Sequence, residues 1–182
     1  MHRLHRDLKA QGHGAARDLV HALLGHLIDS FLLSVVPLAS DSERKRNSNP
    51  RKIYPADPGL IRAFDASGRA NLGHALETAV RNELERRGAE VGYVKTAEGL
   101  EVDFLARLPA SGEELVQVCA DPSVEETLER EVRALREAAK EHPRAARRLL
   151  VLDRDTMPRA STPGVQAQPA YEWLLVAAAD GA

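Results

Sequence analysis

The chain has 182 residues, 43% of them hydrophobic, and a net charge of −2, so it suits one domain of ordinary size with a buried core. Its single cysteine, Cys119, excludes an internal disulfide, and no apolar run approaches the roughly 18 residues of a membrane-spanning helix. We therefore expect a cytoplasmic protein with no membrane partner.

The first third of the chain predicts a helix, a strand, a basic loop and a second strand. Leu19, Leu23 and Leu27 recur every four residues, as in a helix over residues 14–29. An apolar, β-rich run follows at 31–38, residues 40–50 are polar as in an exposed loop, and 52–54 form a returning strand. This order is typical of the end of a winged-helix unit, although residues 1–12 leave little length for its beginning.

A short helix and a connector separate this segment from the rest of the chain. Asp57 is a helix N-cap and Pro58 suits the first helical position, so we expect a helix that ends near residue 64. Residues 65–68 then form the connector. We place a small partial winged-helix segment at 1–66 and an α/β domain at 67–182.

The second part predicts the order helix–strand–strand–strand–helix–strand. A helix over 70–87 precedes strands at 90–95, 101–107 and 114–119. A helix that starts at 121 leads to a continuous apolar strand at 149–152, followed by a loop at 155–168 and a helix at 171–178. The first three strands can form an antiparallel meander, and the helical crossover favours parallel pairing of the fourth. The expected fold class is therefore α/β with a mixed sheet.

This order resembles the core of the PD-(D/E)XK nucleases, in which acids on the first helix and second strand meet a Glu/Asp-x-Lys motif on the third strand. Glu77 matches the helix acid, Asp103 matches the strand acid, and the third motif falls on Gln117-Val118-Cys119. The resemblance implies that Glu77, Glu101 and Asp103 hold Mg²⁺, because hard cations prefer carboxylate oxygens and can activate a water for phosphodiester attack.

The third-strand motif departs from the family pattern. Gln117 offers a neutral amide, and Cys119 stands where the lysine belongs, so the motif itself has no fixed positive charge. Lys95, on the first of the three strands, is the candidate for a relocated catalytic lysine. In the alternative interpretation Glu77 only pairs with Arg81 one turn on, and the strand acids are solvated.

A narrower resemblance covers about residues 14–177. The chain resembles the C-terminal domain of unknown function of prokaryotic AAA-type ATPases. The resemblance rests on the Glu77, Asp103 and Gln117-Val118-Cys119 motifs, on Lys52-Ile53-Tyr54 with Asp57 and Gly59-Leu60, and on the closing Tyr171-Glu172-Trp173-Leu174-Leu175. This chain has no G-x-x-x-x-G-K-[ST] motif, so we expect no ATP site of that kind. The resemblance implies a separate ATPase chain as one class of partner.

A basic group in the first third is a candidate nucleic-acid contact. Residues 1–63 contain 10 Lys or Arg and 6 Asp or Glu, whereas the remainder contains 15 and 21. Positive side chains on a wing can bind phosphates, and an ordinary solvated loop explains the same composition. The candidate residues are Arg44, Lys45, Arg46, Arg51 and Lys52.

Three functional hypotheses follow from these residues. The first is a non-catalytic nuclease-like module that binds nucleic acid or a partner protein. The second is a structural or regulatory protein-interaction domain, and the third is a Mg²⁺-dependent nuclease with a relocated lysine. No feature of the sequence indicates an oligomeric state.

Overall fold

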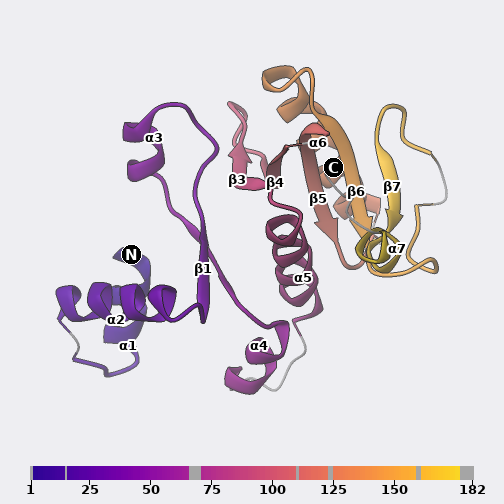
Figure 1. Ribbon diagram of the computed structural model, residues 1–182. Coiled ribbons are helices and arrows are strands. Elements are labelled where there is room, and N and C mark those ends of the chain that lie inside the picture. Colours follow the sequence, from indigo (N-terminus) through magenta and orange to yellow (C-terminus); the bar gives the residue numbers. More distant parts are fainter. Residues whose placement is uncertain are drawn as a thin grey trace.

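The computed structural model describes residues 2–14, 16–65, 71–109, 111–122, 125–158 and 161–176. Its largest element is a five-stranded mixed sheet with the order β3-β4-β5-β6-β7 (Figure 1). Strands β3 (Glu90–Lys95), β4 (Glu101–Leu108) and β5 (Gly112–Cys119) are antiparallel neighbours. Strand β6 (Ala146–Val151) pairs in parallel with β5, and β7 (Gln166–Pro169) pairs in parallel with β6. The predicted α/β class, the meander and the parallel crossover are confirmed.

Helices cover both faces of this sheet. Helix α5 (Leu72–Arg86) and helix α7 (Ala170–Leu175) contribute Val80, Leu84 and Trp173 to the core on one face. Helix α6 (Glu125–Glu141) contributes Leu135 and its neighbours to a second core on the other face. Side chains of β5 alternate between the two cores, as the pleat of a strand requires, so this strand is buried on both sides.

The N-terminal part consists of two helices and a two-stranded hairpin. Helix α1 (His2–Ala10) and helix α2 (Arg17–Asp29) precede β1 (Leu33–Val36), which pairs antiparallel with β2 (Lys52–Pro55). Helix α4 (Pro58–Phe64) follows, with Asp57 capping the backbone N–H of Gly59. Figure 1 shows α1 and α2 on the side of the hairpin away from the sheet.

The hairpin shares its core with the sheet. Val36, Leu38 and Tyr54 are buried in the same cluster as Phe104 and Val80. Two backbone hydrogen bonds join the chain after β1 to Tyr93 of β3, and a Cβ at the adjacent Gly92 would lie 3.0 Å from Ala39 Cβ. Any larger residue at position 92 would therefore push the chain at Ala39 away by a few tenths of an ångström. The predicted boundary between residues 66 and 67 lies outside the described residues.

Two segments predicted as loops contain regular structure. The 40–50 stretch contains helix α3 (Glu43–Ser48), which starts where the Ser42 side chain accepts a hydrogen bond from the backbone N–H of Lys45. The 155–168 stretch contains part of β7, an edge strand that depends on pairing with β6 rather than on apolar alternation. Helix α1 was also not predicted. Among the described helices, none has the length and apolar character needed to cross a bilayer.

Candidate functional site

The ammonium group of Lys52 lies between two of the predicted site carboxylates. Its Nζ is 2.7 Å from Oε1 of Glu101 and 2.9 Å from Oδ1 of Asp103. Lys52 comes from β2, whereas both acids come from β4. The chain therefore supplies a positive charge to this site from a different element than the third-strand motif or β3.

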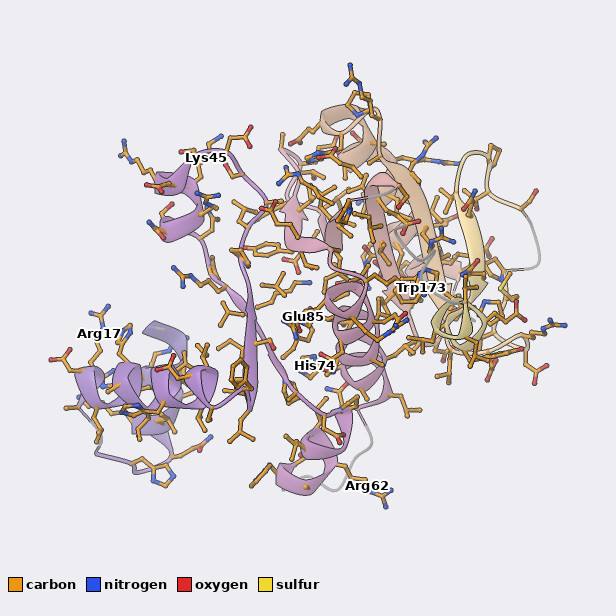
Figure 2. The ribbon with its side chains drawn as sticks, viewed as in Figure 1. Arg17, Lys45, Arg62, His74, Glu85 and Trp173 are labelled. Carbon is orange, nitrogen blue, oxygen red and sulfur yellow. The ribbon has the colours of Figure 1, made fainter. Side chains whose placement is uncertain are left out.

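Tyr54 lies two residues along the same strand and reaches the third predicted acid. Alternation on β2 points Lys52 and Tyr54 to the same side. The Tyr54 hydroxyl donates a hydrogen bond to Oε2 of Glu77 at 3.1 Å, and its ring is fully buried. The Tyr54 ring stacks on the His74 ring of α5, with ring centroids 5.5 Å apart. It also packs against the Phe104 ring, with centroids 5.7 Å apart. Figure 2 shows His74 on the side of α5 that faces the hairpin.

Two hydrogen bonds join Asp103 to strand β5. Its Oδ2 accepts a hydrogen bond from the backbone N–H of Val118 at 3.0 Å, and its own N–H donates to Oε1 of Gln117 at 3.2 Å. The Gln117 amide in turn donates to Oε2 of Glu131 on α6 at 2.7 Å. The glutamine thus links the β4 backbone to α6, and its amide nitrogen points away from the carboxylates around Lys52.

A β-bulge explains how Asp103 reaches this position. Gly92 pairs with Leu105, but Val94 pairs with Val102, so β4 has one more residue than β3 across this interval. Simple alternation predicts that Val102 and Phe104 share a face, and this prediction is wrong: Phe104 packs in the core beneath α5 and Val102 in the core beneath α6. Bulges of this kind re-aim side chains.

The charges of the site stabilise one another. Burial acts to lower the pKa of Lys52, but the Asp103 charge and the hydrogen bonds to Glu101 and Asp103 outweigh it, so the pKa is raised above 10.5. Burial and the neighbouring Glu77 carboxylate raise the pKa of Tyr54. At neutral pH the lysine is therefore cationic and the tyrosine is a neutral hydrogen-bond donor.

The environment of Glu77 moves its titration close to neutral pH. Burial, followed by the Asp103 charge, raises its pKa from 4.5 to about 7, although Lys52 and Tyr54 act in the opposite direction. Burial, followed by the Lys52 charge, lowers the pKa of His74 below 6.5, so this ring is neutral at pH 7. The charge on the Glu77 carboxyl group therefore changes near neutral pH.

The arrangement does not fit a resident Mg²⁺ ion. One oxygen of Asp103 binds the Lys52 ammonium and the other binds the Val118 N–H, while the nearest Glu101 oxygen also binds the ammonium. A hard cation would need these oxygens for itself and would meet the Lys52 charge. Within the described ranges, no group of three or more His, Cys, Asp or Glu side chains is placed as metal ligands.

Cys119 does not provide an alternative nucleophile. The thiol is buried in the core beneath α6. Burial, followed by the Glu131 charge, raises its pKa to about 11, so the thiol stays protonated at neutral pH. Cys119 therefore acts as a small apolar core residue.

The structure brings some of the predicted site residues together and separates others. Glu77, Glu101 and Asp103 surround the Lys52–Tyr54 pair, and Gln117 lies behind Asp103. Lys95 is exposed at the end of β3. Sequence reasoning did not assign Tyr54, His74 or Glu131 to the site, and it gave Lys52 a different role. The available signal was the i, i+2 spacing of Lys52 and Tyr54, which places both side chains on one face.

The predicted basic group divides into two. Arg44 and Lys45 are exposed on α3, Arg46 lies 3.9 Å from Glu43, and Arg51 donates to Asn47. Figure 2 shows Lys45 at the end of the hairpin remote from His74. Lys52 belongs instead to the acid site, where two carboxylates compensate its charge.

Comparison with protein-family models, with curated proteins and with solved structures found no match to this chain.

Proposed function

We propose that this chain is a non-catalytic, nuclease-like module that binds nucleic acid through the exposed basic side chains of α3. The observation that carries the proposal is the position of the Lys52 ammonium between Glu101 and Asp103. A carboxylate pair that binds an internal ammonium group offers fewer free oxygens to a metal ion, which supports a structural role for the two acids. Recognition then falls to the surface rather than to the acid site.

The nuclease-like part of the proposal rests on element order and on two acids. Helix α5, the β3–β4–β5 meander, helix α6 and the parallel strand β6 follow the PD-(D/E)XK order. Glu77 on α5 and Asp103 on β4 are close enough for the Asp103 charge to raise the pKa of Glu77. This arrangement is what an inactive descendant of the C-terminal domains of AAA-type ATPases would retain.

The nucleic-acid part of the proposal rests on a group of basic side chains that lies apart from the acid site. Arg44, Lys45 and Arg46 are consecutive on α3, and Arg51 follows where the chain returns to β2. They lie at the tip of a hairpin whose base is fixed in the core. Exposed cations on a projecting element can contact phosphates without desolvating other groups, and such contacts release counterions from the nucleic acid.

Binding of labelled single-stranded and duplex oligonucleotides, measured by fluorescence anisotropy, tests the proposal. The Arg44→Glu/Lys45→Glu double variant should weaken binding about tenfold or more and flatten its salt dependence. The matched control is Arg133→Glu/Arg136→Glu, which makes the same charge change on the exposed side of α6. Equal losses in the two variants, or no binding by the native chain, would refute a site on α3.

A cleavage assay with Mg²⁺ or Mn²⁺ tests the non-catalytic part. We expect no cleavage by the native chain. Cleavage that disappears in Asp103→Asn and Lys52→Met would favour the third hypothesis, a nuclease in which Lys52, rather than Lys95, is the relocated lysine. Cleavage that persists in Asp103→Asn would indicate a contaminating enzyme.

A further inference from the structure

A small pocket lies between helix α3 and the β3 edge of the sheet. Its volume of about 40 Å³ holds about three water molecules, so it has room for one edge of a planar ligand but not for a whole nucleotide. Leu38 and Leu105 are buried and form an apolar floor, and Gly92 contributes backbone without a side chain. The polar lining residues are Ser40, Arg46, Glu90 and Arg107. The chain after β1, helix α3 and strands β3 and β4 therefore meet at one pocket.

Arg46 connects this pocket to the basic side chains of α3. Arg44 and Lys45 are exposed, whereas Arg46 is partly buried and its side chain lines the pocket. It lies 3.9 Å from the exposed Glu43, which is a loose ion pair. The Arg46 guanidinium can therefore lie flat against an incoming ring, as arginine does with unstacked bases of single strands.

The charges around the pocket oppose one another, which disfavours a simple anion. The Arg107 Nε lies 2.9 Å from Glu113, and its Nη1 lies 3.6 Å from Glu90. A phosphate group in the pocket would meet both carboxylates at close range. A neutral ligand with hydrogen-bond donors and acceptors side by side avoids this repulsion and uses the charges of both signs.

Guanine is the nucleobase that matches this pattern. Its N1–H and 2-amino group are neighbouring donors, which suit the two oxygens of Glu90, and its O6 and N7 are neighbouring acceptors, which suit the guanidinium of Arg107. The two side chains lie next to each other, as the two donors and two acceptors do along the edge of the base. In a duplex, cytosine occupies the N1–H, the 2-amino group and O6, so only an unpaired guanine presents the whole edge.

We propose that this pocket binds the edge of an unpaired guanine in a single strand whose phosphates contact α3. This binding mode rests on the proposed function of α3, and it adds a preferred base and a preferred strand state to that function. Phosphate contacts position a strand without reading its sequence, so the pocket would supply the sequence preference.

Fluorescence anisotropy of the whole chain with two probes tests the preference. The probes are a single-stranded oligothymidylate and the same strand with one central guanine. The native chain should bind the guanine strand about fivefold or more tighter, and the difference should vanish when each strand is annealed to its complement. Glu90→Ala should bring the ratio of the two dissociation constants close to one. The matched control is Glu98→Ala, which makes the same charge change at an exposed position between β3 and β4 and should leave the ratio unchanged.

Titration with guanosine monophosphate tests the pocket without a strand on α3. The amide NMR signals of Gly92 and Ser40 should shift more with guanosine monophosphate than with cytidine monophosphate. Equal binding of the two single strands by the native chain, or a preference that Glu90→Ala leaves intact, would overturn the guanine pocket and leave the proposed function of α3 in place. If no oligonucleotide binds, the proposed function fails instead, and the pocket is overturned as well if guanosine monophosphate gives no shift at Gly92.

Discussion

The Nζ of Lys52 lies 2.9 Å from Oδ1 of Asp103, and this contact joins residues 51 positions apart in the chain. It connects the return strand of the N-terminal hairpin to strand β4 of the sheet. The same strand also inserts Tyr54, which is fully buried, between α5 and Phe104. The strand that carries Lys52 is therefore anchored in the core two residues away, at Tyr54.

Removal of the ammonium group should destabilise the fold. Lys52→Met keeps most of the apolar stem but leaves Asp103 and Glu101 without their cation. Removing one partner of a buried ion pair lowers the free energy of unfolding by about 3–5 kcal/mol. Because Glu101 is exposed, we expect a loss of about 2–4 kcal/mol here. Urea unfolding at pH 7 measures the loss. Lys95→Met, at an exposed position, should change the free energy of unfolding by less than about 0.5 kcal/mol.

The stability should depend on pH through Glu77. Since its pKa is raised from 4.5 to about 7 in the folded chain, the folded state binds this proton more tightly than the unfolded state. The associated stabilisation is complete below about pH 4.5 and is lost as the pH rises through about 7. Glu77→Gln, which stays neutral, should therefore gain stability relative to the native chain between about pH 5 and pH 8.

The expected gain of Glu77→Gln across that range is about 1–3 kcal/mol, from the size of the shift. Urea unfolding of both proteins at several pH values gives the difference, in which the titration of most other groups cancels. A difference that is constant with pH, or one that falls as the pH rises, would contradict the environment described for Glu77.

The Tyr54 hydroxyl should tune this titration. It donates to Glu77 and so favours the charged carboxylate, acting against burial. In Tyr54→Phe the ring still fills the core, but the pKa of Glu77 should move further above 7. Carboxyl chemical shifts from NMR would follow it directly. A downward shift would show that the hydroxyl does not stabilise the charged form.

The Cys119 thiol should be inert in the native state. Its burial and raised pKa of about 11 leave almost no thiolate at pH 8. Reaction with a disulfide reagent should therefore be slow and should become fast in urea. Rapid labelling of the folded chain would mean that Cys119 is accessible, and the core beneath α6 would need revision.

The sheet could be predicted because its information is local. Alternating apolar residues at 90–119 and the amphipathic pattern of α6 dictate strands and a crossover almost independently of context. Helix α3 was missed because it has no apolar stripe, and its Ser42 cap is a weak signal within a charged stretch. Strand β7 was missed because it depends on β6 for its pairing.

The site was predicted only in part, because its key contacts are long-range. The acids Glu77 and Asp103 follow from their places on α5 and β4, but the bulge that re-aims Asp103 has no marker in the sequence. The role of Lys52 was missed for a similar reason. A lysine beside a basic loop suggests a phosphate contact, and only the docking of β2 on the sheet places it between two carboxylates.

A double-mutant cycle between Lys52→Met and Asp103→Asn tests most directly whether the lysine is the internal cation of the acid site. Urea unfolding of the native chain, the two single variants and the double variant gives the coupling energy. We expect about 1.5–3 kcal/mol, with the double variant more stable than the sum of the single losses predicts. A coupling energy near zero would contradict the account, because Lys52 and Asp103 would then be neighbours without being partners.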